Sequence, residues 1–356
     1  MNDLTKTIKA LEELILSSSG AEPFEEVLKI IYAKIYAEKN KIKNQPLEIL
    51  FKGAKIEWPG IFKKTDKIEL PNNCLILCAK ELENTTLNKK NLEIIDIAFE
   101  HLFPKTSKGS KGQFFTPRHI IAEIIKILNP QKDESFLDPA CGSAGFLLHA
   151  MNYGLNTQKV SGIDFDNRMV KIAKAACLLS DFQNINIYNA NALAEIKEIK
   201  DNSFDIIATN PPFGGQIKDK NILQNFELGN PRHILFIEKI IRLIKPGGRA
   251  AIILPQGVLN NTNLSYVREW IFTKARVIGV ISLDLNTFKP HTNVKTSLLF
   301  LQKWKEEPLA DYPVFMAVSA KSGKNLSGKR VFDYDFPEIT NKFRKFIESE
   351  KLWNTL

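Results

Sequence analysis

The segment from Asp205 to Phe213, Asp-Ile-Ile-Ala-Thr-Asn-Pro-Pro-Phe, carries the most specific chemistry in the sequence. Its apolar residues indicate a buried strand that ends in Asn210, Pro211, Pro212 and Phe213. Pro211 forces Asn210 into an extended conformation, and the two prolines stiffen the backbone that follows. The Asn210 side chain and the Pro211 carbonyl would then be two fixed hydrogen-bond acceptors, with the flat ring of Phe213 beside them.

Such an arrangement suits an exocyclic amino group on a flat ring. Two acceptors that take the hydrogens of the amine favour a pyramidal nitrogen and raise its nucleophilicity, while an aromatic side chain stacks on the ring. The alternative interpretation is a rigid turn that Asn210 caps. The segment therefore predicts an amine-binding site at the end of a strand.

A second segment, Phe136 to Phe146, is typical of a ligand-binding loop between a strand and a helix. It begins with Asp138, which would favour a cationic group on the ligand. Small residues that let a ligand approach the backbone follow it: Ala140, Gly142, Ser143, Ala144 and Gly145. The loop has no basic residue for a phosphate and matches none of the common glycine-rich phosphate motifs. A plain tight turn is one alternative, and a nucleophilic pair of Cys141 and His149 is another.

Two further polar side chains follow the next two predicted strands. Asp164 comes one strand–helix–strand step after Asp138, at a place where an acidic residue can accept both hydroxyls of a ribose. Asn191 carries both a donor and an acceptor and could read the edge of an adenine. An exposed acid at a strand end and an ordinary asparagine turn are the alternative interpretations of these two residues.

The chain around these segments alternates between short apolar runs and helical stretches, which predicts a parallel sheet with right-handed crossovers. The predicted strands are 135–137, 160–163, 186–188, 204–208, 250–254, 277–283 and 296–302. The predicted helices are 120–128, 145–151, 168–179 and 234–244. No good helix separates the last two strands, so we expect an antiparallel pair at one edge. The four polar segments then follow the carboxyl ends of strands, where open α/β sheets bind ligands.

Segments with other sequence patterns precede and follow this sheet. Residues 1–104 have apolar side chains at helical spacing and predict an all-α domain. A polar, glycine-rich stretch then opens the predicted catalytic domain, residues 105–308. Residues 309–356 are expected to form a C-terminal extension that packs on the catalytic domain and includes a helix over 337–352.

The four polar segments, in this order, resemble S-adenosylmethionine-dependent amino-methyltransferases. Asn210 to Phe213 resembles the catalytic motif of N6-adenine DNA methyltransferases. The segment Gly112-Gln-Phe-Phe-Thr-Pro-Arg118 resembles the motif before the cofactor loop in modification subunits of type I restriction-modification systems. Later stretches are similar to parts of the same subunit: 243–257, 292–300, 314–317 and 336–339.

This resemblance implies a Rossmann-like S-adenosylmethionine-dependent methyltransferase sheet with an antiparallel edge pair, preceded by an all-α N-terminal domain. It implies S-adenosylmethionine as the cofactor and no metal, because the leaving group is a neutral thioether. The implied catalytic residues are Asn210, Pro211, Pro212 and Phe213. The implied cofactor-binding residues are Gln113, Phe114, Phe115, Thr116, Pro117, Arg118, Asp138, Ala140, Gly142, Ser143, Ala144, Gly145, Asp164 and Asn191.

The implied reaction transfers a methyl group to N6 of an adenine in double-stranded DNA. A base inside a duplex is out of reach, so the adenine would be flipped into the site and stack on Phe213, with Phe288 opposite. Arg118, Lys295 and the lysines between 105 and 111 are candidate phosphate contacts. The implied protein partners are a specificity subunit and a restriction subunit.

The sequence departs from that family in three places. Asn191 stands where the family more often has an aspartate, although an asparagine carbonyl can also accept a hydrogen bond from an adenine amine. Ala144 takes the place of a glycine of some relatives. Family members usually continue into C-terminal helices that hold the specificity subunit, whereas this chain stops at Leu356. Its tail of about 50 residues is too short for an independent target-recognition domain.

Composition limits the class of protein. The 356 residues include 49 Lys+Arg and 40 Asp+Glu, a formal net charge of +9 that suits a polyanionic partner. No stretch approaches the roughly 18 apolar residues of a membrane span, and acidic residues near the start do not fit a signal peptide. The four cysteines predict buried thiols rather than disulfides. We therefore expect a cytoplasmic protein with no membrane partner.

Two other kinds of function remain open at this point. A methyltransferase that acts on a glutamine amide of a protein, or on RNA, can use the same Asn-Pro-Pro-aromatic arrangement. A non-catalytic DNA-binding or assembly subunit can keep the same fold. The chemical identity of the methylated product separates the methyltransferases from one another, and a lack of S-adenosylmethionine binding would favour the non-catalytic subunit.

Overall fold

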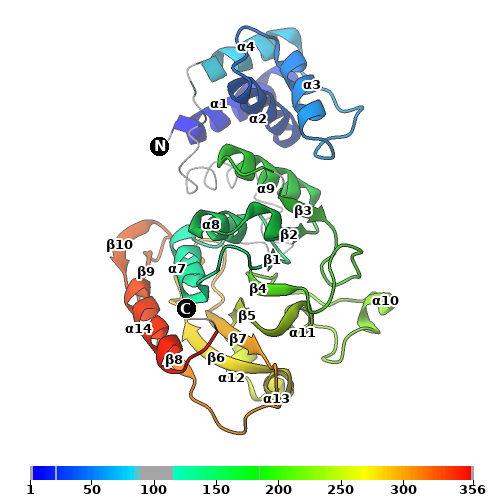
Figure 1. Ribbon diagram of the computed structural model, residues 1–356. Coiled ribbons are helices and arrows are strands. Elements are labelled where there is room, and N and C mark those ends of the chain that lie inside the picture. The colour runs from blue at the N-terminus through cyan, green and yellow to red at the C-terminus, as the bar shows by residue number, and fades with distance from the viewer. Residues whose placement is uncertain are drawn as a thin grey trace. The chain divides into compact units, whose positions relative to one another are not determined.

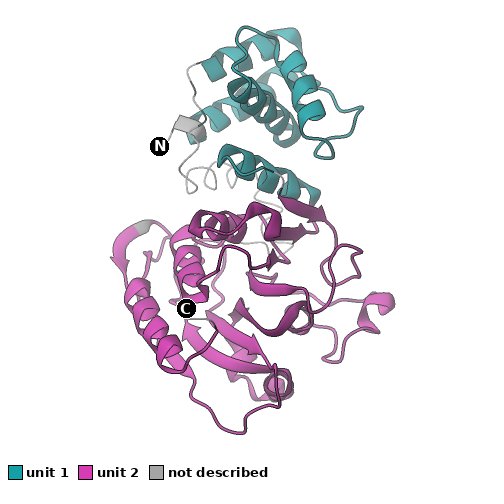
Figure 2. Cartoon of the chain, in the orientation of Figure 1, with its two compact units in different colours: residues 1–107, 167–183 teal, residues 108–166, 184–356 magenta. Residues whose placement is uncertain are grey.

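The computed structural model describes residues 3–20, 22–83, 85, 87, 115–183 and 185–353. The chain divides into two compact units, which Figure 2 shows in different colours: residues 1–107 with 167–183, and residues 108–166 with 184–356. Gln113, Phe114 and the lysines between 105 and 111, for which cofactor or phosphate contacts were predicted, lie outside the described residues. The predicted domain boundaries at 104 and 308 stay a prediction.

The described secondary structure of the first unit is helical, which confirms the predicted helical N-terminal region. Figure 1 labels its helices: α1 (Asp3–Ser19), α2 (Pro23–Lys39), α3 (Leu47–Glu57), α4 (Asn72–Glu83) and α9 (Asn167–Leu179). In α2, the Tyr32 hydroxyl donates a hydrogen bond to the Lys171 carbonyl of α9 at 2.8 Å. The Lys171 ammonium also forms an ion pair with Glu25 at 2.6 Å. A helix from the middle of the chain therefore packs with the N-terminal helices, which its sequence pattern did not indicate.

An eight-stranded sheet forms the centre of the second unit. Its strands are β1 (Phe136–Asp138), β2 (Val160–Asp164), β3 (Asn186–Asn189), β4 (Phe204–Thr209), β5 (Ile244–Pro255), β6 (Ala275–Ser282), β7 (Thr296–Lys303) and β8 (Phe315–Val318). Their order is β3-β2-β1-β4-β5-β7-β6-β8, and the first five strands in this order are parallel. Every strand predicted from the sequence is present, so the predicted α/β fold with a parallel sheet is confirmed.

The predicted antiparallel pair is also confirmed, but it lies inside the sheet. β7 runs antiparallel to both β5 and β6 and separates them. The connection from β6 to β7 contains no helix, so the chain returns directly and the two strands run in opposite directions. The edge strand is β8, which pairs in parallel with β6 and which the sequence patterns did not predict.

Helices connect the strands of this sheet, and most of them pack against it. The long ones are α7 (Arg118–Leu128), α8 (Gly145–Tyr153), α11 (Arg232–Leu243) and α13 (Ser265–Lys274), and the short ones are α10 (Lys220–Leu223) and α12 (Gly257–Asn260). All residues of β1 and β2 are buried, as expected for central strands that are covered on both faces. A Cβ at Gly162 of β2 would lie 2.7 Å from Leu147 Cδ1 of α8 and 3.0 Å from the Cys141 sulfur. The close approach of α8 therefore requires a glycine at this position.

The C-terminal part of the second unit contains a hairpin of β9 (Ser322–Lys324) and β10 (Arg330–Tyr334), followed by α14 (Phe336–Ser349). The helix confirms the predicted C-terminal helix, whereas the hairpin was not predicted. Phe343 of α14 stacks on Phe315 of β8, with ring centroids 4.4 Å apart and planes 5° apart. A Cβ at Gly279 of β6 would overlap the Phe343 ring, so this glycine allows α14 to pack closely on the sheet.

In the part of the chain that the structure describes, no helix has both the length and the apolar surface needed to cross a membrane. Cys74, Cys78, Cys141 and Cys177 are buried and take part in no disulfide, which confirms the prediction of buried thiols. Cys74 and Cys78 lie one helical turn apart in α4.

Candidate active site

The carboxyl ends of four neighbouring strands bring the predicted polar segments to one edge of the sheet. In the order β3-β2-β1-β4, these strands end at Asn189, Asp164, Asp138 and Thr209. The strands are parallel, so their carboxyl ends meet at the same edge. Asn191 follows β3 and Asn210 follows β4. Side chains from widely separated parts of the sequence therefore lie along a single edge.

The loop after β1, residues 139–144, forms a tight turn that we call the cradle. Gly142 has φ +50° and Ala144 has φ 68°, so two residues take the left-handed conformation before α8 begins. The Cys141 N–H donates to the Ile163 carbonyl at 2.9 Å, and the Gly142 N–H donates to an Asp164 carboxylate oxygen at 3.0 Å. A Cβ built at Gly142 would have no neighbour within 4 Å. The loop is therefore tied to β2 and has open space beside its backbone.

Asp138, the last residue of β1, is only 1% exposed. One of its carboxyl oxygens accepts a hydrogen bond from the Ala140 N–H at 3.0 Å. Burial raises the pKa of Asp138 to about 7 and the charge of Asp164 adds to the rise, while the Ala140 N–H lowers it. A cationic group beside Asp138 would favour its ionised form. This side chain therefore suits the cationic part of a ligand.

Asp164, the last residue of β2, is fixed by the backbone around it. Its two carboxylate oxygens accept hydrogen bonds from the Gly142 N–H at 3.0 Å and the Asp166 N–H at 2.8 Å. The side chain is 7% exposed, so the alternative of an exposed acid at a strand end is wrong. A carboxylate oxygen can accept more than one hydrogen bond, and the contact of Asp164 with two ribose hydroxyls stays a prediction.

Phe165 is a residue of this edge that the sequence interpretation missed. Its side chain is 72% exposed. The Asn189 side-chain amide donates to the carbonyls of Asp164 and Phe165 at 3.1 and 3.0 Å, which fixes the backbone on which the ring stands. An exposed aromatic side chain on a fixed backbone suits stacking on a flat ring. The available signal was an aromatic residue between two aspartates at the end of a predicted strand.

Asn191 forms a local turn. Its side-chain oxygen accepts a hydrogen bond from the Leu193 N–H at 3.1 Å. This is the asparagine turn that was the alternative interpretation of the residue. A carbonyl oxygen has a second lone pair, so a contact between Asn191 and an adenine amine stays a prediction.

Asn210 is held by a residue 94 positions earlier in the chain. Its side-chain nitrogen donates a hydrogen bond to the Thr116 hydroxyl oxygen at 3.1 Å. The oxygen and nitrogen of an amide point in different directions, so this bond also fixes where the Asn210 oxygen is presented. Pro211 is buried and Pro212 is half-buried, as expected for a rigid segment packed against the sheet. No sequence pattern indicated the contact between Thr116 and Asn210.

The ring of Phe213 is half-buried and meets Phe288 edge to face. The two ring centroids are 6.1 Å apart and the ring planes are 85° apart. Two rings that sandwich a base must be parallel to each other, so the predicted placement of Phe288 opposite Phe213 is wrong in this arrangement. Phe288 is 1% exposed and supports the Phe213 ring from the side.

Arg118 is buried, which overturns its prediction as a contact to a DNA phosphate. Its side chain is 8% exposed, and a Cβ at Gly145 would lie 3.2 Å from its Nη1 atom. Burial and the charge of Arg118 lower the pKa of His149 to about 3.

Cys141 is 4% exposed and packs beside Gly162, so it is not presented as a nucleophile. The contact of exposed Lys295 with a phosphate stays a prediction.

Phe115, Pro117 and Ser143 are further described residues for which a cofactor contact was predicted, and these contacts stay predictions. Phe115 and Pro117 lead into α7, and Ser143 lies buried within the cradle. The edge as a whole presents a buried acid, an acceptor for hydroxyl groups, an exposed aromatic ring and a rigid amide. These groups fit a ligand with a cationic part, a ribose and a flat ring, and they fit an amino group beside it.

Comparisons with known proteins identify a family and relatives of this chain. The family model N-6 DNA Methylase matches residues 93–355. A type I restriction enzyme EcoEI methylase subunit from Escherichia coli is 29% identical over 225 residues, which is 58% of this chain and 46% of that subunit. The StySPI methylase subunit from Salmonella potsdam is 33% identical over 232 residues, which is 58% of this chain and 43% of that subunit. The chain thus matches less than half the length of each of these relatives.

A solved structure shares the fold along almost the whole chain. It is a protein of Listeria monocytogenes that is assigned to the class I S-adenosylmethionine-dependent methyltransferases. The TM-score is 0.68 at 19% sequence identity, and the match covers 97% of this chain and 98% of that protein. At this identity the likeness concerns the fold, and it confirms the predicted methyltransferase architecture.

Proposed function

Because the chain belongs to the N-6 DNA methylase family, we propose that it transfers a methyl group from S-adenosylmethionine to N6 of an adenine in DNA, as the modification subunit of a restriction-modification system. The observation that carries the proposal is the 3.1 Å hydrogen bond between Asn210 and Thr116. It fixes the amide of the Asn-Pro-Pro-Phe segment at the end of β4, and β4 pairs with the strand that leads into the cradle. The methylase subunits among the relatives support the same activity.

In this proposal the cofactor lies along the ends of β1, β2 and β3. When bound, S-adenosylmethionine supplies a methyl group on a sulfur atom that departs as a neutral thioether, so the transfer needs no metal. Asp138 would face the cationic part of the cofactor, and the backbone at Gly142 would lie against it. Asp164 would accept the ribose hydroxyls, while Phe165 and Asn191 would contact the adenine ring and its amine.

The acceptor site is built from the segment after β4. The Asn210 side-chain oxygen and the Pro211 carbonyl oxygen would accept the two hydrogens on N6 of the target adenine, and Phe213 would stack on its ring. As the new carbon–nitrogen bond forms, N6 loses one of its two protons. An amide oxygen and a backbone carbonyl are too weakly basic to keep that proton, so it passes to water. Catalysis then comes from orientation and from acceptors that are already in place.

The target adenine would have to leave the DNA duplex to reach Asn210, because N6 is inaccessible inside the stack. We propose that a specificity subunit selects the DNA sequence and that a restriction subunit joins the same assembly. The curated relatives support this, since both are named as methylase subunits of type I restriction enzymes.

The Asn210→Ala variant tests the proposal. Truncation removes an acceptor that acts on the reacting amine, so we expect methyl transfer to fall by about 10²–10³ while cofactor affinity is retained. The measurement is transfer of a radiolabelled methyl group to unmethylated genomic DNA, followed by separation of the nucleosides, with cofactor binding measured by calorimetry. Asn341→Ala, at an exposed position of α14, serves as the matched control.

Three results would contradict the proposal. These are label in a base other than adenine or in a protein, a fully active Asn210→Ala variant, and a parent chain that binds no S-adenosylmethionine. Cofactor binding without transfer by the chain alone would instead indicate that the specificity subunit is required.

A further inference from the structure

The β9–β10 hairpin exposes apolar and basic side chains that have no part in the proposed methyl transfer. Phe332 on β10 is 105% exposed, and Leu326 in the turn between the strands is 79% exposed. Large apolar side chains that are this exposed on one short hairpin indicate an interaction surface. Figure 1 shows the hairpin beside α7 and α14.

The turn of the hairpin is rigid. The Asn325 side-chain oxygen accepts hydrogen bonds from the N–H groups of Ser327 and Lys329 at 3.1 and 2.9 Å. The Asn325 N–H also donates to the Lys329 carbonyl at 2.9 Å. Because the tip is already ordered, the hairpin loses little conformational entropy when a partner binds it.

One side of the hairpin is braced by the segment that carries Phe288. Gly328 has φ +79°, and a Cβ there would lie 2.7 Å from Pro290 Cδ. The Lys324 ammonium donates to the Lys289 carbonyl at 3.0 Å. Phe288, directly before Lys289, supports the ring of Phe213. The base of the hairpin is therefore coupled to the proposed stacking residue.

The other side of the hairpin is braced by the start of α7. A ring nitrogen of His119 is hydrogen-bonded to the Ser322 carbonyl at 2.9 Å. The His119 ring also meets Tyr334 edge to face, with centroids 5.0 Å apart. His119 follows closely after Thr116, which holds the Asn210 amide. Both braces thus connect the hairpin to the proposed acceptor site.

The charge of the hairpin region favours an anionic partner. Residues 321–335 contain four basic and two acidic side chains. Asp333 pairs with Lys321 at 2.9 Å, and Asp335 keeps its charge while it accepts a hydrogen bond from the Ser319 hydroxyl at 2.6 Å. Lys329, at the end of the turn, is exposed. Together with Phe332, it offers a positive charge and an aromatic ring, which are the two features that proteins use to hold phosphates and bases.

We propose that the β9–β10 hairpin is a DNA-contacting element that borders the site of the target adenine. Phe332 packs on bases or sugars of the duplex, and Lys329 contacts a phosphate. Removing a base from the stack costs a few kcal/mol, and an apolar side chain that enters the disturbed stack offsets part of that cost. The inference rests on the proposed function, because that function places DNA next to Phe213.

The test uses the full chain and a short fluorescent DNA duplex of mixed sequence, with affinity measured by anisotropy over a series of salt concentrations. Phe332→Ala should weaken binding about tenfold, the usual effect of losing one aromatic contact to a base. Lys329→Gln should lower the slope of log affinity against log salt by about one. Phe272→Ala on α13 and Lys345→Gln on α14 are matched controls at exposed positions and should bind like the parent chain.

The outcomes separate this inference from the proposed function. If Phe332→Ala and Lys329→Gln bind like their controls, the inference is overturned, and a protein partner becomes the occupant of the hairpin. A parent chain that does not bind the duplex at low salt overturns it as well. Calorimetry with S-adenosylmethionine on the same preparations judges the proposed function independently. Unchanged cofactor binding by Phe332→Ala would show that the fold of the variant is intact.

Discussion

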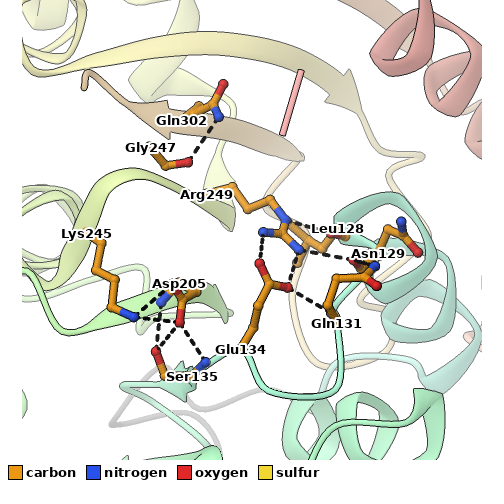
Figure 3. A network of polar contacts seen from close by, with 10 residues as sticks. All are labelled: Leu128, Asn129, Gln131, Glu134, Ser135, Asp205, Lys245, Gly247, Arg249 and Gln302. Carbon is orange, nitrogen blue, oxygen red and sulfur yellow. Dashed lines mark hydrogen bonds and ion pairs between the residues drawn. The ribbon is translucent and has the colours of Figure 1, made fainter. Parts of the chain in front are cut away.

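The two ends of the central sheet treat buried charge in opposite ways. At the carboxyl ends of the strands, Asp138 is 1% exposed and burial raises its pKa to about 7. Near the amino ends of β1 and β4, Figure 3 shows a network in which the guanidinium group of buried Arg249 makes two hydrogen bonds of 2.7 Å with Glu134. At the carboxyl ends, burial disfavours the charged form of an acid. At the amino ends, hydrogen bonds and opposite charges stabilise the charged side chains.

The charged side chains at the amino ends each have several hydrogen-bond partners. Arg249 also donates to the Leu128 carbonyl at 2.7 Å and to the Asn129 carbonyl at 3.1 Å. Asp205 accepts from Lys245 at 2.8 Å and from the Ser135 hydroxyl at 2.6 Å. Burial raises the pKa of Asp205, but these hydrogen bonds and the charge of Lys245 outweigh it and lower the pKa below its ordinary value.

The difference indicates that one end of the sheet contributes to stability and the other end to ligand binding. Bonded charges at the amino ends connect the end of α7 to β1, β4 and β5 and stabilise the fold. The acid at the carboxyl ends is less favourable until a cationic ligand group arrives beside it. Substitutions at the two ends should therefore have separable effects on stability and on ligand binding.

The largest expected effect is on stability at the amino ends. Arg249→Ala should lower the free energy of unfolding by about 3 kcal/mol, because it leaves the Glu134 carboxylate and two carbonyls without their partner. Cofactor affinity of the folded variant should stay within about twofold of the parent chain. Urea unfolding and calorimetry measure the two quantities. Lys342→Ala, which removes an exposed pair with Glu338, is the control and should change stability by less than about 0.5 kcal/mol.

A second prediction concerns pH at the carboxyl ends. A cationic ligand group needs Asp138 ionised, so cofactor affinity should rise about tenfold between roughly pH 6 and pH 8 in the parent chain. Asp138→Asn should bind with little pH dependence over that range. Titration calorimetry at several pH values is the measurement, and a flat parent profile would contradict the assignment of Asp138.

Asp138 and Asp205 should affect the pH dependence of the stability of the ligand-free chain in opposite directions. The folded pKa of Asp138 is raised, so its contribution to stability is present below about pH 4 and is lost as the pH rises towards 7. The folded pKa of Asp205 is lowered, so its contribution is present above about pH 4 and is lost as the pH falls further. The Asp138→Asn variant should lose the decline in stability between about pH 4 and pH 7, and the Asp205→Asn variant should lose the decline below about pH 4. Urea unfolding at several pH values measures both, and the same pH dependence in the two variants would contradict this prediction.

A smaller effect is expected from Thr116, which positions Asn210. Thr116→Val keeps the shape of the side chain but removes the hydroxyl acceptor, so the single-turnover rate of methyl transfer should fall about fivefold to tenfold. Thr116→Ser keeps the hydroxyl and should retain most of the rate. If the serine variant is as slow as the valine variant, Thr116 acts through packing rather than through its hydrogen bond.

The smallest effect is expected at Ala144 in the cradle. Its left-handed conformation, with φ 68°, costs a residue other than glycine about 1 kcal/mol. In Ala144→Gly, relief of that strain is offset by a more flexible unfolded chain and the loss of a buried methyl group, so stability should change by less than about 1 kcal/mol. Thermal unfolding tests this, with Gly142→Ala expected to be the less tolerated change because it adds strain at φ +50°. A loss of several kcal/mol in Ala144→Gly would show that the methyl group packs in an essential contact.

Much of the fold could be predicted because its signals are local. Strand–helix alternation located the seven strands from β1 to β7, and helical spacing located α9 and α14. The carboxyl ends of the strands then indicated where Asp138, Asp164 and Asn210 would lie, because a parallel sheet places those ends at one edge. These inferences need only the residues within one element and the rules that connect neighbouring elements.

The remaining features depend on contacts between distant segments. Periodicity showed that residues 168–179 form a helix but not that this helix packs with the N-terminal helices through Tyr32. It did not show that Thr116 holds Asn210, that Arg118 is buried or that Phe288 meets Phe213 edge to face. Each of these depends on which surfaces meet when the elements pack.

The sequence by itself therefore determined the class of fold, the segment proposed to be catalytic and the edge of the sheet to which the polar residues belong. These follow from residue type and spacing, which govern local backbone conformation and burial. Only the tertiary structure decided which partners hold those residues, how Asp138 and Asp205 acquire opposite pKa shifts, and where the hairpin with Phe332 is anchored. The physical reason is that hydrogen bonds, burial and electrostatic fields depend on distance in space, which separation along the chain does not specify.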